Sequence, residues 1–529
     1  MLKFDWAQPY PSRRQPILAR NAVATSQPLA TQAGIAMLQR GGNAVDAALA
    51  TAISLTVLEP CSNGIGSDLF AIVWDGRRLS GLNASGRAPA AVTPSRYAGQ
   101  SAMPQRGWEP VTIPGAVSGW SALSQRYGAL PFADLFDPAI RYARHGYAVS
   151  PIVAEKWALA TTVLPHEFGF AEHFMPRGRA PLPGETFSCP AMATSLEKIA
   201  ATHGNAFYGG ELAEAMVADA KRHGAAHTLS DFAGHAIDWV ETLALDYGGA
   251  TVHEIPPNGQ GIAAQIALGI LKSFDLTALA PDSAASQHLQ IEAMKLAFAD
   301  VHRYVSDPLT MTIPAAAMLD PGYLASRARL IDAKRAQNFG PGKPPTGGTV
   351  YLCAADASGM MVSLIQSNYM GFGSGVVVPG TGISLQNRGV GFSLERGHAN
   401  EIGGGKRPFH TIIPGFLMQD GAPLAAFGVM GGPIQPQSHV QTLVRLLTYG
   451  MNPQAALDAP RWKVISGMSL DLESSASPEL RKGLVALGHD LKSAVDSYMD
   501  FGAGQFIVRC DNGYVAASDP RRDGQAAGF

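Results

Sequence analysis

Gly347 and Gly348 separate a segment with the composition of a loop from a segment with the composition of a β-strand. Residues 337–348 are rich in proline and glycine, and they end in Gly347-Gly348. A segment of this kind holds neither a helix nor a β-ladder, so we expect an exposed and pliable linker. From Thr349 onward the residues are β-branched, aromatic or apolar, and a turn at Ser358-Gly359 leads into a second run of the same type. The sequence therefore predicts a β-hairpin whose first strand begins at Thr349.

A threonine at such a junction has a chemical use. Its hydroxyl is a weak nucleophile unless an adjacent base activates it, and its own free α-amine can be that base. An α-amine has a pKa of about 7.7–8.0, so much of it is available as a base near neutral pH. Freeing the amine of Thr349 requires cleavage of the Gly348–Thr349 bond, and Gly348 has no side chain to obstruct attack on its carbonyl. An ordinary loop-to-strand junction has the same sequence, so the hypothesis rests on residues elsewhere.

Bulk properties exclude several other classes of protein. The 529 residues are 46% hydrophobic and 16% charged, which suits a compact enzyme with a large core. A net charge near −2 provides no basic excess to replace counterions, so we expect no nucleic-acid partner and no membrane partner. The four cysteines are scattered without a CxxC pair, which indicates neither a zinc site nor a disulfide framework. We find no GxSxG, Walker A or HExxH motif, and we expect no metal and no cofactor.

The N-terminal residues predict the compartment. They lack the basic-then-apolar pattern of a signal peptide, and the longest apolar runs are interrupted by glycine, proline or charge. We therefore expect a cytoplasmic protein.

Local patterns predict individual elements. A helix should begin at Pro28 and end at Gly41-Gly42, and Asn43 should cap a second helix. Phe70–Leu82 reads as a hairpin around Asp75-Gly76. Residues 107–330 are predicted to be mainly helical, and residues after Thr349 are rich in strand signals up to Gln435. Periodicity alone supports only an α/β or α+β fold.

Blocks spread along nearly the whole chain support the threonine hypothesis. They are Gly41–Ala48, Asn63–Gly66, Thr349–Tyr351, Phe372–Gly375, Lys406–Pro408, Gly431-Gly432, Ala459–Trp462 and Asp519–Gly524. In this order they resemble the γ-glutamyltranspeptidases, N-terminal-nucleophile hydrolases that cleave themselves before a threonine. The resemblance implies a four-layer αββα sandwich of the α/β (α+β) class. It also implies a precursor cleaved at Gly348–Thr349 into a large subunit, 1–348, and a small subunit, 349–529, which form a heterodimer and can assemble further.

The resemblance also implies roles for particular residues. Thr349 is the nucleophile, and its freed α-amine is the base. Ser367 supplies a hydroxyl that forms a hydrogen bond near the nucleophile. The backbone N–H groups of Gly431 and Gly432 stabilise the oxyanion, since glycine lets such donors approach a developing charge. His410 and Thr411 fall where typical members have two serines that bind the substrate carboxylate, and both can still donate hydrogen bonds.

Departures from the family pattern concern the substrate pocket. The arginine that typically binds the glutamyl α-carboxylate aligns with Ser85, although Arg87 lies two residues further on. The acidic residue that typically holds the α-ammonium aligns with Gly391. Tyr369 replaces an asparagine, and Arg388 stands where glutamine is usual. The pocket has thus lost an anion and gained a guanidinium, which makes Arg388 the expected carboxylate ligand, with His410, Thr411 or Arg87 assisting.

Three functions remain open on these grounds. The first is hydrolysis, through an acyl-enzyme, of a small carboxylate-bearing amide, as in the oxamate amidohydrolases of this family; Ser85, Arg388 and Gly391 favour it. The second is a γ-glutamyl hydrolase or transferase acting on glutathione-like compounds. The third is a catalytically inactive homologue, against which the retention of Thr349, Ser367 and the glycine pair argues.

Overall fold

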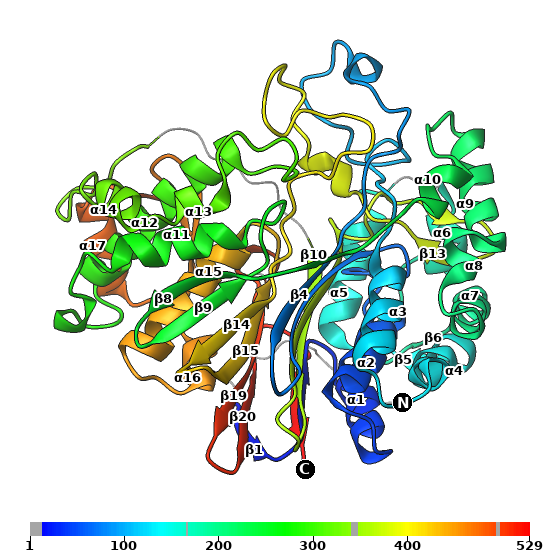
Figure 1. Ribbon diagram of the computed structural model, residues 1–529, viewed down its shortest axis with the longest axis horizontal. Coiled ribbons are helices and arrows are strands. Elements are labelled where there is room, and N and C mark those ends of the chain that lie inside the picture. Colours follow the sequence, from blue (N-terminus) through cyan, green and yellow to red (C-terminus); the bar gives the residue numbers. More distant parts are fainter. Residues whose placement is uncertain (1–12, 165–167, 340–347, 493–497) are drawn as a thin grey trace.

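Two antiparallel sheets form the centre of the molecule. The computed structural model describes residues 13–164, 168–339, 348–492 and 498–529 (Figure 1). The predicted linker lies mostly in 340–347, outside the described residues. The first sheet has the order β21 (Gln525–Gly528), β2 (Ala22–Thr25), β10 (Gly348–Ala355), β11 (Met361–Tyr369), β3 (Asp68–Trp74), β4 (Leu79–Ala84) and β7 (Asp238–Val240). The second has the order β1 (Ile17–Ala19), β20 (Gly513–Ser518), β19 (Ala503–Cys510), β15 (Ala422–Met430), β14 (Gly415–Gln419), β9 (Ala250–Glu254) and β8 (Leu243–Tyr247).

Helices cover the outer face of each sheet. Beside the first sheet lie α1 (Pro28–Gln39), α2 (Ala44–Leu58), α3 (Ala116–Tyr127), α4 (Asp137–His145), α5 (Pro151–Thr161), α6 (Phe170–Phe174), α7 (Pro190–Ala201), α8 (Asn205–Tyr208), α9 (Glu211–Arg222) and α10 (Leu229–Ala233). Beside the second lie α11 (Gly261–Leu271), α12 (Ala284–Tyr304), α13 (Ala315–Met318), α14 (Pro321–Ala328), α15 (Ile434–Leu443), α16 (Pro453–Asp458), α17 (Pro478–Ala486) and α18 (Tyr498–Phe501). Short sheets pair β5 (Tyr147–Ala148) with β6 (Thr186–Phe187), β12 (Val377–Val378) with β13 (Ile383–Ser384), and β16 (Trp462–Ser466) with β17 (Ser469–Leu472) and β18 (Asp490–Lys492).

Three hydrophobic clusters hold the layers together. One joins the first sheet to its helices, and a second joins the second sheet to α11, α12 and α15. A third lies between the sheets, where Phe70 and Ile365 of one sheet meet Phe416 and Ile507 of the other. The predicted four-layer αββα sandwich is therefore confirmed, with one buried interface between each pair of adjacent layers.

Capping explains why α2 begins where the sequence predicts. The side chain of Asn43 accepts hydrogen bonds from the N–H groups of Val45 and Asp46, and Asp46 accepts one from Asn43 in return. All residues of α2 are buried, and α1 packs closely on it. A Cβ on Gly34 would lie 2.4 Å from Thr51 Oγ1, so this crossing requires glycine.

The region 107–330 contains strands that the sequence analysis missed. β7, β8 and β9 lie inside the span predicted to be mainly helical, and β8 and β9 form a hairpin around Gly248-Gly249. Their burial alternates along the chain, which is the period of a half-buried strand. The predicted hairpins at 70–82 and after Thr349 are confirmed. Across the described ranges, we find no helix with the length and hydropathy needed to cross a bilayer.

Candidate active site

Strand register brings the predicted nucleophile to one end of the first sheet. Thr349 is the second residue of β10, and β10 pairs antiparallel with β11, whose last residues are Ser367 to Tyr369. Gly348 lies opposite Tyr369 and Val350 opposite Gln366, so Thr349 lies at a register shift where β11 has one residue more than β10. Tyr369 has a φ of 75°, a left-handed value uncommon for a residue with a side chain. Irregular backbone of this kind is frequent at functional sites.

The hydroxyls of Thr349 and Ser367 face each other. Thr349 Oγ1 lies 3.1 Å from Ser367 Oγ, and both residues are fully buried. Ser367 Oγ also accepts a hydrogen bond from the N–H of Tyr369 at 2.8 Å. The structure thus places Ser367 beside Thr349, where the prediction needs it.

Arg388 places a buried cation next to this hydroxyl pair. Its guanidinium donates from Nη2 to Ser367 Oγ at 3.2 Å and from Nη1 to Thr411 Oγ1 at 2.7 Å. Its Cζ lies 4.4 Å from the ring centroid of Tyr369, within cation–π range. Burial lowers the pKa of Arg388 to about 10, against the opposing effect of Asp68, so the group stays protonated near neutral pH. A positive charge therefore lies one hydroxyl away from Thr349.

Asp68 is a site residue that the sequence analysis missed. It is the first residue of β3 and lies opposite Ser367 in the register. One carboxylate oxygen accepts hydrogen bonds from the N–H groups of Gly86 and Gly115, both at 3.2 Å, and the other lies 3.1 Å from His410 Nε2. Burial raises the pKa of Asp68 to about 6, although Arg388 and the two N–H groups oppose the rise. A lone acidic residue just after Asn63–Gly66 was the available signal.

His410 holds Asp68 instead of facing the hydroxyls. Its Nδ1 accepts a hydrogen bond from the N–H of Ile412, so Nε2 carries the proton and donates it to Asp68. Burial lowers the pKa of His410 well below its usual range, and Arg388 lowers it further. Both ring nitrogens have partners, and these contacts do not support the predicted direct binding of a substrate by His410.

Gln260 forms hydrogen bonds with both Thr411 and the glycine pair. Gln260 Nε2 donates to the carbonyl of Thr411 at 2.7 Å and to that of Gly432 at 3.0 Å. Gly431 and Gly432 have φ values of 128° and 67°, where residues with side chains are strained. Within the described residues, neither of their N–H groups donates a hydrogen bond. The arrangement fits the predicted oxyanion donors.

Arg87 does not join this cluster. Its Nη1 forms an ion pair with Asp307 at 3.0 Å and donates to the carbonyl of Gly405, and more than a third of the side chain is exposed. Ser85 instead donates to Asn83 Oδ1 at 2.7 Å. The predicted assistance of Arg87 in binding a carboxylate is not supported by these contacts, because the guanidinium already has an acidic partner.

A cavity of about 460 Å³ opens beside the cluster. Its lining includes Tyr369 and Thr411, both of which contact Arg388, together with Gln260, Gly391 and Pro433. A Cβ on Gly391 would lie 2.4 Å from the carbonyl oxygen of Phe409. A side chain at that position would require this backbone to shift, which agrees with the expected loss of an acidic group at Gly391.

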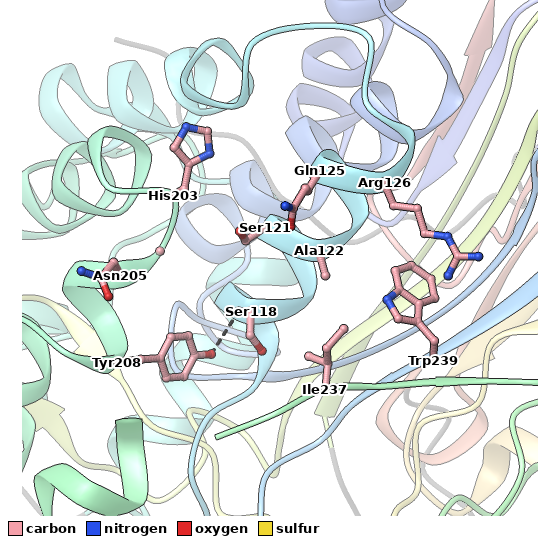
Figure 2. A pocket seen from close by; sticks show the side chains of 11 residues that line it. Ser118, Ser121, Ala122, Gln125, Arg126, His203, Asn205, Tyr208, Ile237 and Trp239 are labelled. Atoms are coloured by element: carbon pink, nitrogen blue, oxygen red, sulfur yellow. Dashed lines mark hydrogen bonds between the residues drawn. The ribbon is translucent and has the colours of Figure 1, made fainter. Parts of the chain in front are cut away.

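A second pocket of about 480 Å³ lies on the outer helices (Figure 2). Figure 2 shows Tyr208 hydrogen-bonded to the backbone N–H of Ser118, with Arg126 beside Trp239. None of the predicted site residues lines this pocket. It is therefore separate from the candidate active site.

One described group of side chains has the composition of a metal site. Ligand atoms of His288, Glu292 and His489 lie within 4.8 Å of one another. His288 Nδ1 and His489 Nε2 already share a hydrogen bond of 2.8 Å, and Glu292 pairs with Lys295 at 2.7 Å. His489 Nδ1 is buried without a hydrogen-bond partner among the described residues, and the absence of a metal requirement stays a prediction.

Comparison with known proteins assigns the fold to a family. A family model described as Gamma-glutamyltranspeptidase matches residues 30–529. The chain belongs to the γ-glutamyltranspeptidase family. It is 35% identical to the glutathione hydrolase-like YwrD proenzyme of Bacillus subtilis, covering 96% of this chain and 98% of that protein. It is 36% identical to the oxamate amidohydrolase proenzyme of Klebsiella pneumoniae, covering 95% and 97% respectively.

A solved structure matches the whole chain. The cephalosporin acylase from Bacillus halodurans superposes with a TM-score of 0.96 at 46% identity, covering 100% of this chain and 99% of that one. These relatives are named as hydrolases and acylases, and the chain is an enzyme of this N-terminal-nucleophile amidohydrolase class. The inactive-homologue alternative is therefore set aside. The proenzyme names imply cleavage into subunits in this family.

Proposed function

We propose that this enzyme is a self-processing threonine amidohydrolase that hydrolyses the amide of a small, carboxylate-bearing substrate of the oxamate type through an acyl-enzyme. One observation carries the proposal: the guanidinium of Arg388 lies a single hydroxyl away from Thr349. In oxamate the carboxylate is bonded directly to the amide carbonyl. A nucleophile that attacks this carbonyl needs its anion-binding group close by, as Arg388 is.

Processing comes first in the proposed sequence. Thr349 Oγ1 attacks the carbonyl carbon of Gly348, the peptide C–N bond breaks, and an ester replaces it. Water then hydrolyses the ester, which leaves a carboxyl on Gly348 and a free α-amine on Thr349. Thr349 is fully buried in the uncleaved chain, with Gly348 held opposite Tyr369. Cleavage divides residues 1–348 from 349–529 and releases Gly348 from that position, which opens access to Thr349.

Turnover then uses the freed amine. It takes the proton of Thr349 Oγ1 as the oxygen attacks the substrate carbonyl. The N–H groups of Gly431 and Gly432 stabilise the oxyanion, and the amine returns the proton to the leaving nitrogen. Water hydrolyses the acyl-enzyme by the reverse proton path. Throughout, Arg388 holds the substrate carboxylate with charge-assisted hydrogen bonds, and Thr411 keeps the guanidinium in place.

The charge of the pocket disfavours a γ-glutamyl group. That group carries an α-ammonium, which is costly to bury without an acidic partner. Gly391 leaves no room for an acid, Asp68 is fully buried with both oxygens hydrogen-bonded, and the acidic residue that does line the cavity, Glu395, is exposed. Three carbons also separate the glutamyl carboxylate from the reacting carbonyl, so a carboxylate on Arg388 would hold that carbonyl away from Thr349.

A spacer series tests the proposal. Oxamate, malonamate, succinamate and glutamine place a carboxylate progressively further from the amide. We expect kcat/KM to fall along this series, with Thr349→Ala as the inactive control. Turnover of γ-glutamyl-p-nitroanilide or glutathione far above that of oxamate would overturn the proposal.

A γ-glutamyl hydrolase or transferase is the second candidate. The similarity to the glutathione hydrolase-like relative supports it, and so does Glu395, an exposed acidic residue that lines the cavity. If Glu395 holds the α-ammonium, Glu395→Gln lowers kcat/KM for glutathione and leaves that for oxamate unchanged.

A further inference from the structure

The cavity beside Arg388 is much larger than oxamate. Its volume is about 460 Å³, which lies in the range of pockets that bind drug-sized ligands. Oxamate has only six non-hydrogen atoms and would leave most of this space unfilled. The size indicates that a further part of the substrate occupies the cavity.

Apolar side chains form about half of the cavity lining, and the polar ones include Gln260, Ser393, Asn400 and the exposed Glu395. The apolar ones are Val305, Tyr369, Val390, Phe392, Phe409 and Pro433. His302 also lines it, and burial lowers the pKa of His302 to about 4, so this ring is neutral near pH 7. Neither lysine nor arginine occurs among the described lining residues. A carboxylate placed in the cavity would find no cation there, whereas an apolar group would find close partners.

The position of Arg388 fixes which end of the substrate faces the cavity. Arg388 is 1% exposed and is not among the lining residues, whereas Tyr369 and Thr411, which both contact it, line the cavity. A carboxylate bound by Arg388 therefore lies at the inner end, next to Thr349 and Ser367. In an oxalyl amide the acyl part ends there. Pro433, directly after the glycine pair, lines the cavity, so the cavity is the space next to the oxyanion donors that can receive the amine of the scissile bond.

We propose that the cavity is a subsite for a bulky, apolar amine, and that the substrates are N-substituted oxamates in which a short oxalyl group is joined to a large hydrophobic amine. This inference rests on the proposed function, since it takes the oxalyl carboxylate to be bound by Arg388. The reaction remains hydrolysis: the C–N bond breaks, the amine leaves with a proton, and water supplies the new oxygen of oxalate.

Two substrates with similar leaving groups test the subsite. N-methyloxamate and N-phenethyloxamate both release a primary alkylamine, so they differ mainly in the apolar group that enters the cavity. We expect the purified, processed enzyme to show a kcat/KM for the phenethyl compound at least about tenfold above that for the methyl compound. Oxamate and γ-glutamyl-p-nitroanilide are measured alongside.

A cavity-filling variant localises the effect. Val390→Phe should reduce the phenethyl-to-methyl ratio of kcat/KM to near one, because the added ring takes the space of the substrate ring. Val485→Phe is the matched control, since Val485 is 54% exposed and belongs to α17, away from the cavity lining; its ratio should equal that of the wild type.

Each outcome separates the two proposals. A ratio near one in the wild type, with oxamate still hydrolysed, overturns the subsite and leaves the proposed function standing. A high ratio that Val390→Phe does not reduce also overturns the subsite, because the amine then binds elsewhere. Turnover of γ-glutamyl-p-nitroanilide without turnover of any oxamate overturns the proposed function, and the subsite with it.

Discussion

Two buried arginines in this molecule have opposite surroundings. Arg461 lies 2.6 Å from Asp519, and Arg521 contacts the same carboxylate at 3.1 Å. Burial alone would raise the pKa of Asp519, but Arg461 and Arg521 more than offset it, so this pKa is lowered. Arg388 meets two hydroxyls and an aromatic ring, and no described carboxylate lies within ion-pair distance of it. Burial raises the pKa of the nearby Asp68.

The difference indicates what each cluster is for. A buried guanidinium that is already paired with carboxylates stabilises the fold, and removing it leaves an uncompensated charge. A buried guanidinium that contacts only neutral groups keeps its capacity for an anion. The first arrangement joins the end of β20 to the start of β16, and the second lies beside Thr349.

Alanine substitution of the two arginines should give opposite profiles. Arg461→Ala is expected to lower the free energy of unfolding by about 3–5 kcal/mol, because Asp519 loses a buried partner. Arg388→Ala should lower kcat/KM for oxamate, and the loss should correspond to about 2 kcal/mol or more of transition-state stabilisation. The loss of stability should be smaller than for Arg461→Ala, and self-cleavage should stay intact. Urea denaturation and steady-state kinetics measure both. Equal effects on stability and no effect of Arg388→Ala on kcat/KM would contradict the comparison.

The two aspartates should contribute to stability with opposite dependence on pH. The folded-state pKa of Asp68, about 6, exceeds the usual value of 3.8, so between these two pH values the folded state binds more protons than the unfolded state. The stability of the wild type relative to Asp68→Asn should therefore fall by about 2 kcal/mol as pH rises from 4 to 6.5. For Asp519 the folded-state pKa is lowered, so its contribution is present above 3.8 and is lost as pH falls below that value. Urea titrations of the wild type, Asp68→Asn and Asp519→Asn at several pH values test this, and pH slopes of the same sign for the two aspartates would refute it.

Two serines of β11 sharpen the comparison on a smaller scale. Ser367 contacts Thr349 and Arg388, whereas Ser363, four residues earlier, lies 2.8 Å from Tyr351 Oη and donates to the carbonyl of Phe427. Ser367→Ala should lower kcat by about tenfold, the equivalent of about 1.4 kcal/mol. Ser363→Ala should lower the melting temperature, because its two hydrogen-bond partners lose the hydroxyl, and it should leave kcat unaltered. A reversal of these effects would mean that the contacts of Ser367 are structural.

Local signals explain what could be predicted from the sequence. The Asn43 cap and the hairpin signals at 70–82 and after Thr349 act over a few residues, and the structure has each of them. Asp68 lies just after the Asn63–Gly66 block, but that position does not reveal its role, because its partner His410 lies 342 positions away and meets it only in the folded chain. Arg87 was chosen for its closeness in sequence to Ser85, but Asp307, 220 residues away, pairs with it. Neighbours in sequence also diverge: Thr411 contacts Arg388, while His410 contacts Asp68.

The intact mass of the purified wild-type protein tests the role of Thr349 most directly. Cleavage before Thr349 predicts two chains, one of 348 residues and one holding the remaining 181 of the 529, with threonine at the N-terminus of the smaller. Thr349→Ala should give a single chain without activity, and Thr349→Ser should retain slow processing, because a hydroxyl remains. A single uncut wild-type chain with full activity on oxamate, or a cut at any other bond, would contradict the assignment of Thr349 as the nucleophile.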